Sequence, residues 1–456
     1  MSGIDTLNIA KDSLLSHQTA INITGTNIAN ANTAGYSRQR ATFSTLIPGV
    51  EIAGIERIYD QFLGVQINEQ ANELGDSEAK KDALGRVEMI FNETSGGGIN
   101  ELLSKFWSAW EDLSANPSGQ AERVTLVSTS QSLASLFRSS GDDLIAAQDD
   151  ANTRVSSLVT LVNDYVSDMA DINNKIQASV GTANDSSLNS LKDSQENLLS
   201  DLAEIVDFHY VRNADDSVSV FLSNGMPLVD GGQSWALDTV TDDQTTFYNV
   251  VFADDPTVEI NTSLTKGSLA AYLEVRDTTI VGYLDSLNTL AATLATEINT
   301  QHALGYDINQ DLGGDFFYFD VSPAAQEARY LKVSAAIIAD VNKVAASATV
   351  NGDGENAVSM SEIKDELTMN SGTSTFSTYY SSLVGQVGQD VAYENRNFDH
   401  YTNLLTQLTN KREEVSGVSI DEEMMSLIKY QTGYTASAKL FTAAQELAET
   451  LMSLVQ

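Results

Sequence analysis

Hydrophobic positions recur at alternating spacings of three and four along the last stretch of the chain, from residue 420 to residue 455. This is the heptad pattern of a helix that packs one face against a partner helix. It continues for more than four heptads without a Pro, and three carboxylates stand in the first turn, where they favour the positive end of the helix dipole. The positions predicted to face a partner are Met424, Leu427, Gln431, Tyr434, Ala438, Phe441, Ala448 and Met452.

The first thirty residues carry a second heptad pattern, which predicts a helix from about residue 4 to residue 30. Polar side chains interrupt its apolar face, so this helix should be marginal alone and become ordered on association. Because an amphipathic helix cannot bury its own apolar face, we expect the two chain ends to pair and to form an assembly surface. An ordinary core helix is the alternative. The residues that recur every seven positions are Leu7, Leu14, Ile21 and Ile28.

The middle of the chain combines long helical patterns with one change of period. Two helices joined by a short loop near Gly181 should fold back antiparallel. Between about 205 and 270 the period becomes two, and Asn224-Gly225 is a strong hairpin signal. The other segments predicted are a short β element within 41–66, a helix over about 62–92, helices over 99–205 and a long helix over 376–415.

These patterns predict a mainly α fold. Long helices from the N- and C-terminal parts should form a coiled coil or bundle, with a small inserted β-rich domain. The expected division is an N-terminal assembly helix over 1–40 that pairs with a C-terminal assembly helix over 416–456, the two halves of a helical bundle over 41–204 and 271–415, and a β-rich insertion over 205–270.

The charge of the chain narrows the choice of partners. Its 456 residues include 63 acidic and 25 basic side chains, a net charge of −38. A nucleic-acid partner is excluded, because basic residues are needed to displace the counterions of phosphates, and an anionic membrane surface is disfavoured for the same reason. No uninterrupted run of about 18 apolar residues predicts membrane insertion. Cysteine is absent, which removes disulfides, thiolate metal sites and cysteine nucleophiles.

Candidate catalytic and metal-binding residues are few. The four histidines lie far apart in the sequence and outside metal or hydrolase motifs. His17 is expected to pack within the N-terminal helix interface, and His302 to end a helix as a cation that favours the negative dipole end. Asp307, Asn309 and Asp311 imitate the first ligands of a calcium loop, but the required Gly and bidentate Glu are missing, so a turn is favoured. We predict no catalytic residue, cofactor or metal.

Three motifs resemble those of one bacterial family. The segment 27–40 contains Ala-Gly-Tyr-Ser-Arg-Gln, the segment 298–317 contains Asn-Thr-Gln-His and Gly-Asp-Phe-Phe, and residues 416–423 read Ser-Gly-Val-Ser-Ile-Asp-Glu-Glu. Together they are similar to the FlgK family of flagellar hook-associated proteins. The matching residues at the two chain ends are Asn27, Asn30, Asn32, Gly35, Tyr36, Arg38, Gln39, Gly417, Asp421, Glu422 and Glu423.

The resemblance implies a structural subunit without catalytic activity. It implies export by the flagellar type III pathway without a cleaved signal peptide, an extracellular place in the flagellum, and self-assembly at the hook–filament junction. The implied partners are other copies of the chain in a ring or tube, the hook protein, the next hook–filament junction protein and a flagellar export chaperone. Three alternatives stay open: a secreted coiled-coil adhesin, another axial protein of the hook or rod, and an enzyme in the β-rich insertion.

Overall fold

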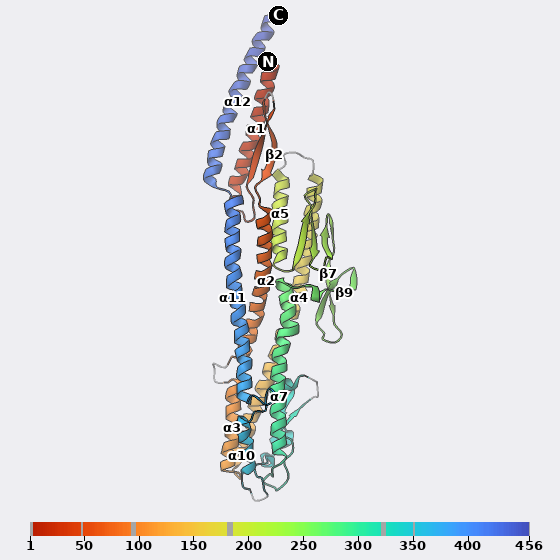
Figure 1. Ribbon diagram of the computed structural model, residues 1–456, viewed down its shortest axis with the longest axis vertical. Coiled ribbons are helices and arrows are strands. Elements are labelled where there is room, and N and C mark those ends of the chain that lie inside the picture. Colours follow the sequence, from red (N-terminus) through yellow and green to blue (C-terminus); the bar gives the residue numbers. More distant parts are fainter. Residues whose placement is uncertain are drawn as a thin grey trace.

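The computed structural model describes residues 3–46, 49–92, 97–179, 186–320, 325–349 and 352–455. The predicted break at Gly181 lies outside these ranges. Long helices run along most of a narrow, elongated molecule, and both chain ends lie at the same tip (Figure 1). This arrangement confirms the predicted mainly α fold, with long terminal helices and a small strand-rich region beside the bundle.

The two ends of the chain form the upper part of the molecule, which we call the terminal unit (Figure 1). α1 and α12 lie side by side and run in opposite directions, because Asn27 contacts Glu423 whereas His17 contacts Gly433. A β-hairpin packs against this pair through a small shared core. Both predicted terminal helices are confirmed. The terminal unit consists of α1 (Gly3–Ala29), β1 (Gln39–Leu46), β2 (Gly49–Arg57) and α12 (Ile420–Val455).

A bundle of long helices forms the body below the terminal unit (Figure 1). α2 lies along α11, and α5 folds back along the upper part of the 60-residue α4, as predicted for an antiparallel pair. One turn of π-helix (Val275–Thr279) joins α6 to α7 in a continuous helix. The helices of the bundle are α2 (Gln61–Ile90), α3 (Ile99–Ala115), α4 (Gln120–Ser179), α5 (Ser186–Ala203), α6 (Gly267–Glu274), α7 (Ile280–His302) and α11 (Phe376–Ser416).

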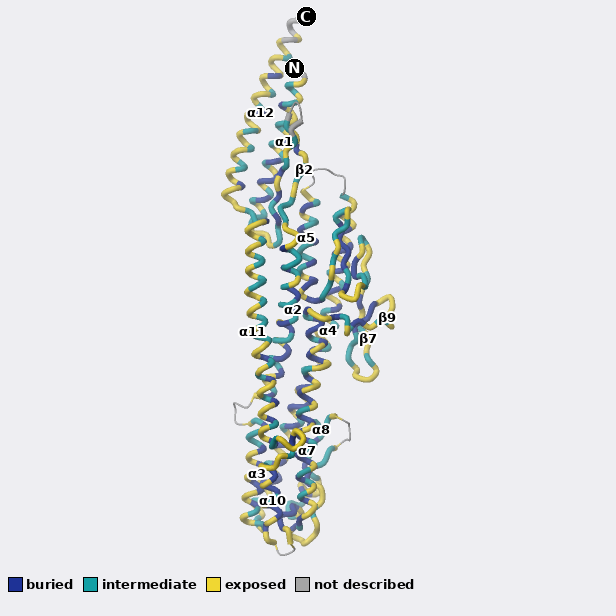
Figure 2. The backbone as a smooth tube through the Cα atoms, in the orientation of Figure 1, coloured by how far each residue is buried: buried dark blue, intermediate teal, exposed yellow. Residues whose placement is uncertain are grey.

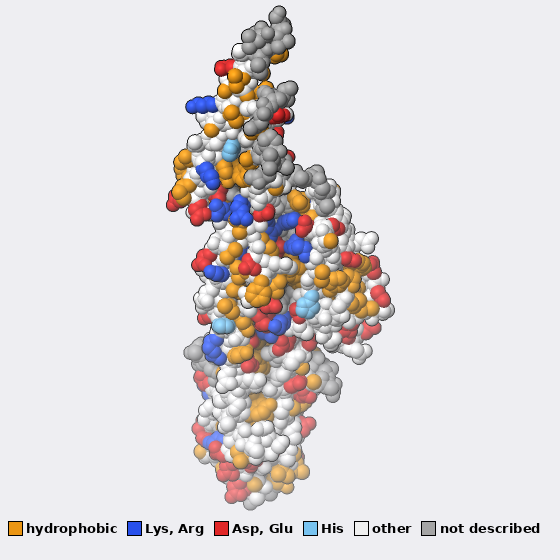
Figure 3. Space-filling model, turned by 45° about the horizontal axis from the view of Figure 1, so that its top comes forward, with side chains coloured by type: hydrophobic (Ala, Val, Ile, Leu, Met, Phe, Trp, Pro, Cys, Tyr) orange, Lys and Arg blue, Asp and Glu red, His pale blue; other side chains and the backbone are white. Residues whose placement is uncertain are grey.

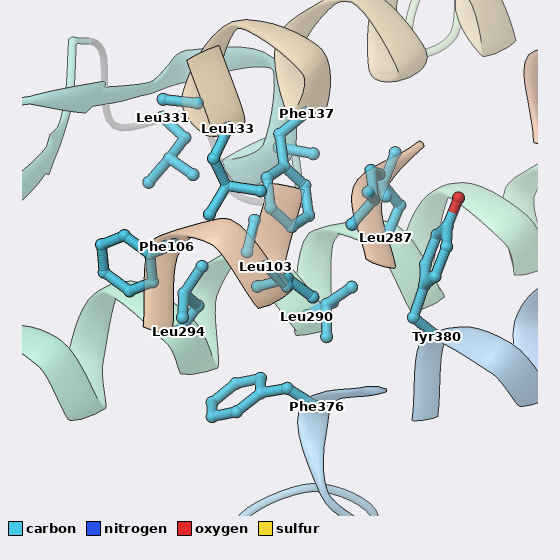
Figure 4. Close-up of a cluster of buried hydrophobic side chains, with 14 of the residues drawn as sticks. Leu103, Phe106, Leu133, Phe137, Leu287, Leu290, Leu294, Leu331, Phe376 and Tyr380 are labelled. Atoms are coloured by element: carbon cyan, nitrogen blue, oxygen red, sulfur yellow. The ribbon is translucent and has the colours of Figure 1, made fainter. Parts of the chain in front are cut away.

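The lower half of the bundle holds the largest hydrophobic core. Side chains from α3, α4, α7 and α11 converge there (Figure 4), and Phe106, Trp110 and Phe137 have no exposed surface. Burial of one such large apolar side chain contributes about 1.5–3 kcal/mol. This half of the bundle is therefore densely stabilised by its own contacts. The residues labelled in Figure 4 are Leu103, Phe106, Leu133, Phe137, Leu287, Leu290, Leu294, Leu331, Phe376 and Tyr380.

The strand-rich region contains one four-stranded and one three-stranded antiparallel sheet, ordered β3-β4-β5-β6 and β7-β8-β9. The predicted hairpin at Asn224-Gly225 is confirmed, and Gly225 has a φ of 84° that suits glycine. Val218 and Val220 are buried in a core shared with α4 and α5. The strands are β3 (Phe208–Arg212), β4 (Val218–Leu222), β5 (Pro227–Asp230), β6 (Gln233–Ser234), β7 (Leu237–Thr241), β8 (Tyr248–Phe252) and β9 (Asp255–Glu259), followed by the 3-10 turn η1 (Asn261–Ser263).

Short elements between α7 and α11 close the lower end of the bundle. Arg123, fully buried at the start of α4, holds them in place: its Nη1 donates to the carbonyl of Val344 at 2.6 Å and its Nη2 to that of Pro117 at 2.7 Å. The elements are β10 (Phe317–Phe319), α8 (Glu327–Tyr330), β11 (Leu331–Val333), α9 (Ala335–Ala339), η3 (Val341–Lys343), α10 (Glu355–Glu362) and η4 (Ile363–Asp365).

His302 is not the cation that its place at a helix end predicts. Its ring is fully buried, and its Nε2 accepts a hydrogen bond of 2.9 Å from the backbone N–H of Ala345, which requires a neutral ring. Its Nδ1 lies 2.6 Å from the carbonyl of Gly314. Burial lowers the pKa of His302 to about 4. The cost of burying a charge outweighs the helix dipole here.

Burial is unevenly distributed along the molecule. Figure 2 shows buried residues throughout the lower bundle, whereas α12 is exposed over most of its surface. In the part of the chain that the structure describes, no helix combines the length and the apolar composition needed to cross a membrane.

Candidate assembly site at the terminal unit

The face that α12 turns toward α1 is made of small and polar residues. Among the side chains of α12 that the structure describes, Glu423, Ser437 and Ala444 are buried, and Tyr430 is half-buried between them. These four positions recur every seven residues, which is the spacing of a two-helix seam. Small residues allow the two helices to approach closely, but they bury little apolar surface. The buried residues among the described side chains of α1 are Ala10, Ser16, Ala20, Ile23, Thr24 and Asn27.

The predicted seam of α12 is displaced by one residue at alternate positions. Met424 and Gln431 are exposed, and Glu423 and Tyr430 face α1 instead. The reason is that hydrogen bonds hold Glu423 at the start of the helix and so set the rotation of α12 about its axis. Of the other predicted residues, Tyr434 and Met452 are exposed, and Leu427, Ala438, Phe441, Ala448, Leu7, Leu14, Ile21 and Ile28 are half-buried.

The outward face of α12 therefore carries large apolar side chains. Met424 exposes 52% of its surface, Met425 65% and Ile428 61%. Hydrophobic side chains lie open on the terminal unit in the face shown in Figure 3. Singly exposed hydrophobic residues are common on proteins, but three within two helical turns indicate a surface that another molecule can cover.

An aromatic cluster holds the hairpin, α1 and α12 together. The ring centroids of His17, Phe43 and Tyr430 lie 6.0–6.4 Å from one another. Gly433 leaves room for the imidazole, since a Cβ at this position would stand 2.6 Å from His17 Cε1. Burial lowers the pKa of His17, which favours the neutral form of the ring. The expectation that His17 packs in the helix interface is confirmed.

Asn27 is the centre of a polar cluster that we call the junction cluster, consisting of Asn27, Tyr36, Arg38, Gln39 and Glu423. The Oδ1 of Asn27 accepts from the backbone N–H of Gln39 at 3.0 Å and from the hydroxyl of Tyr36 at 2.8 Å. Its Nδ2 donates to the carbonyl of Gln39 at 2.8 Å and to Glu423 at 3.1 Å. A buried carboxamide with four partners fixes how the chain turns between α1 and β1.

Arg38 connects the two ends of the chain. Its side chain donates from Nε to Glu423 at 2.7 Å and from Nη1 to Glu422 at 2.8 Å. Its backbone N–H donates to the carbonyl of Ser416 at 2.8 Å, at the end of α11. A Cβ at Gly417, directly after α11, would stand 2.3 Å from the carbonyl oxygen of Glu413, so the chain passes from α11 into α12 at a place with room only for glycine. Motif residues that lie almost 400 positions apart in the sequence thus meet in one place.

The base of the terminal unit rests on α5, through residues that the sequence motifs did not include. Asp193 accepts from the backbone N–H of Ser37 at 3.2 Å and pairs with Arg57 at 3.4 Å. Arg57 also lies 3.5 Å from Glu196. These acids belong to a helical segment without any distinctive motif, and no signal in a single sequence could have identified them.

Gly35 explains one of the motif positions. Its φ is 76°, and a Cβ there would stand 2.0 Å from Oδ1 of Asn197 on α5. The backbone conformation therefore favours glycine, and a larger residue would also have to displace the side chain of Asn197. The remaining motif residues lie at the edge: Asn30 donates to the carbonyl of Thr26 at 3.0 Å, and Asn32 and Asp421 are exposed.

Residues 307–311, which imitate the first ligands of a calcium loop, form a turn that is closed by hydrogen bonds of their own side chains. Asp307 accepts from the backbone N–H of Asp311 at 2.9 Å, and its other oxygen lies 3.4 Å from Nδ2 of Asn309. Within the described ranges, no group of three or more His, Asp or Glu side chains is placed to hold a metal ion.

The paired chain ends are thus held by a buried polar cluster and bordered by exposed apolar residues, in an elongated helical fold whose described residues place no group to hold a metal ion. The chain belongs to the FlgK family of flagellar hook-associated proteins, because the model of the family's helical domain matches residues 84–317, just over half of the chain. A second model, of the C-terminal region of flagellar basal body rod proteins of the FlgEFG type, matches residues 410–454. These matches confirm the resemblance drawn from the motifs, and they make the chain a structural component of the bacterial flagellum.

Curated relatives match almost the whole chain. The flagellar hook-associated protein 1 of Bacillus subtilis is 27% identical, over 98% of this chain and 97% of the relative. That of Escherichia coli is 24% identical, over 98% and 99%. The solved structure of the flagellar hook junction protein FlgK from Burkholderia pseudomallei has the same fold, with a TM-score of 0.69 over 77% of this chain and all of that chain, at 17% identity.

Proposed function

We propose that this chain is a structural subunit that joins the flagellar hook to the filament and assembles through its terminal unit. The observation that supports the proposal is the difference between the two faces of α12. The inner face packs on α1 mainly through small and polar residues, whereas Met424, Met425 and Ile428 on the outer face are exposed to solvent. The names of the relatives that match over nearly the full length support the place of the subunit in the flagellum.

Assembly would bury the apolar side chains of α12 that the single chain leaves exposed. Fully burying a side chain such as Met or Ile contributes about 1.5–3 kcal/mol, so neighbours that cover the exposed residues of α12 supply a driving force that the monomer lacks. Ordering of the thinly packed terminal helices then becomes favourable at the same moment. Such coupling keeps the free subunit soluble and confines tight packing to the assembled ring or tube.

The partners would follow from the same surface. Further copies of the chain would cover the terminal unit from the side, with hook protein on one side of the ring and the next hook–filament junction protein on the other. A flagellar export chaperone would shield the terminal helices before assembly. The subunit would act outside the cell, after export by the flagellar type III pathway without a cleaved signal peptide. The residues proposed to form the assembly interface are the predicted heptad positions of α1 and α12.

Charge substitutions in the terminal helices test this proposal. Phe441→Asp and Leu14→Asp place a carboxylate on half-buried positions of the two helices. We expect the body to stay folded, the variants to be exported, and incorporation into the flagellum to be lost. The measurements are thermal unfolding of the purified chain, motility of cells that carry only the variant, and the amount of the chain in isolated hook–filament structures compared with the culture medium.

Val240→Asp is the matched control. Val240 lies on β7 and exposes 41% of its surface, so the same new charge there should leave incorporation unchanged. Normal incorporation of both terminal variants would contradict the proposal. Retention of the variants inside the cell would indicate a defect in export instead.

A further inference from the structure

A groove runs along the upper body, outside the terminal unit. One hollow of about 400 Å³ lies between α4 and α5, and a second of about 530 Å³ lies where α2, α4 and α6 meet. Both hollows have Asp201 in their lining, so they adjoin each other, and we call them together the body groove. The lining residues on which its properties depend are Leu158, Leu161, Tyr165, Ile172, Leu198 and Tyr272 on its floor, and Glu78, Asp168, Asp171, Asp201 and Glu204 on its rim.

The floor of the body groove is a second apolar face of α4. The first face buries Val155, Val162 and Met169 in the core. Leu158, Tyr165 and Ile172 recur every seven residues beside it and are only half-buried, and Leu161 exposes 36% of its surface. This spacing suits a further helix packed along α4. The stretch from Leu158 to Ile172 is about 21 Å long, which matches a helix of roughly 14 residues.

The carboxylates of the rim outnumber the two cations that line the same hollows, Arg154 and Lys175. Among the described residues, Glu78, Asp168, Asp171, Asp201 and Glu204 make no ion pair within 4.0 Å. Burial raises the pKa of Asp201, and burial together with the charges of Asp201 and Glu78 raises that of Glu204. A cation seated between these carboxylates would relieve their repulsion.

We propose that the body groove binds a basic amphipathic helix of another protein, with its apolar face on Leu158, Leu161 and Tyr165 and its Lys or Arg side chains against the carboxylates of the rim. A second copy of this chain is a poor occupant, because residues 61–409 carry 51 acidic and 17 basic side chains and would repel one another. The proposal concerns the body and does not depend on the assembly of the terminal unit.

Synthetic helices test the proposal on the full chain. The probes are a fluorescent 15-residue peptide with a Leu/Lys heptad pattern and its Leu/Glu counterpart, and the measurement is fluorescence anisotropy at physiological salt. We expect the Lys peptide to bind and the Glu peptide not to. The double substitution Asp201→Asn with Glu204→Gln should weaken binding roughly tenfold. Leu161→Ser should weaken it as well, because the helix loses an apolar contact on the floor.

Asp243→Asn with Asp254→Asn is the matched control, since it removes the same charge from exposed positions of the strand-rich region. Binding that falls equally in the control would reflect net charge alone and overturn the proposal, and so would unchanged binding in Leu161→Ser. Thermal unfolding verifies that each variant is folded. A photo-crosslinking residue at position 161 in flagellated cells identifies the occupant: a product with a second protein that bears a basic helix supports the proposal. A product of twice the chain's mass, or none, overturns it.

Discussion

The terminal unit and the lower bundle are both built from long helices, but they are filled in different ways. In the lower bundle, Phe106, Trp110 and Phe137 are completely buried among leucines. In the terminal unit, the buried side chains of α12 that the structure describes are one Glu, one Ser and one Ala. Helical structure alone therefore says little about stability. What differs is the apolar surface that the packed helices remove from water, which is much larger in the lower bundle than between α1 and α12.

The largest contrast should come from removing one aromatic ring in each region. Phe106→Ala leaves a cavity in the lower bundle and should lower the free energy of unfolding by about 3–5 kcal/mol. Phe441 on α12 is only half-buried, so Phe441→Ala should change the stability of the free chain by less than about 1 kcal/mol. Urea unfolding followed by circular dichroism measures both. Equal losses of unfolding free energy at the two positions would contradict the difference in packing between the lower bundle and the terminal unit.

Acid should act on the lower bundle through His302. A buried His with its pKa lowered from 6.5 to about 4 stabilises the fold fully above pH 6.5, and this contribution is lost as the pH falls from 6.5 toward 4. The loss is on the order of 3 kcal/mol. The measurement is unfolding of the parent chain and of His302→Gln between pH 7 and pH 4. The difference in unfolding free energy between the parent chain and His302→Gln should become smaller as the pH falls. A difference that stays constant with pH would contradict a neutral, buried His302.

A polar substitution should loosen the terminal unit while the body stays intact. Asn27→Ala leaves the backbone of Gln39 and the hydroxyl of Tyr36 without their partner in a buried place, at a cost of about 1–3 kcal/mol. Hydrogen exchange should become faster in residues 3–46 and 420–455 alone. Asn32→Ala, at an exposed position of the same motif, is the control and should leave exchange unchanged. Faster exchange in the lower bundle would show that the two regions are coupled.

The smallest effect is expected at the edge of the junction cluster. Glu422 pairs with Arg38 but its side chain is 57% exposed, so Glu422→Gln should cost less than about 1 kcal/mol. Glu423→Gln, at a side chain only 4% exposed, should cost more, because it weakens a charge-assisted hydrogen bond with Arg38 that is shielded from water. Thermal unfolding measures the loss of stability in each variant. A larger loss in Glu422→Gln than in Glu423→Gln would show that the exposed ion pair contributes more than the buried one.

Much of the fold followed from local patterns. α12 begins and ends where the heptad pattern does, because the pattern is long and no Pro interrupts it. The hairpin at Asn224-Gly225 was predictable because few other residues tolerate positive φ. The fold class and the antiparallel pairing of α4 with α5 followed for similar reasons.

The parts that could not be predicted depend on contacts between distant residues. The heptad pattern favoured Met424 over Glu423 as an inward position because it weighs hydrophobicity, whereas Asn27 and Arg38 turn Glu423 inward by hydrogen bonding. The same limit applies to Asp193, whose partners Ser37 and Arg57 lie more than 130 positions away. Motif residues at the two chain ends were recognised by resemblance, but their meeting in one cluster required the structure.

Two covalent connections cross the border between the terminal unit and the body. The chain passes upward from α11 to α12 and downward from the hairpin to α2. Arg38 bridges the two passages, because its N–H donates to the carbonyl of Ser416 at 2.8 Å and its carbonyl accepts from the N–H of Ile58 at 2.9 Å. A force along the long axis is thus shared by two segments of the backbone. A single tether would leave the upper part free to swivel, whereas two attachment points transmit torque.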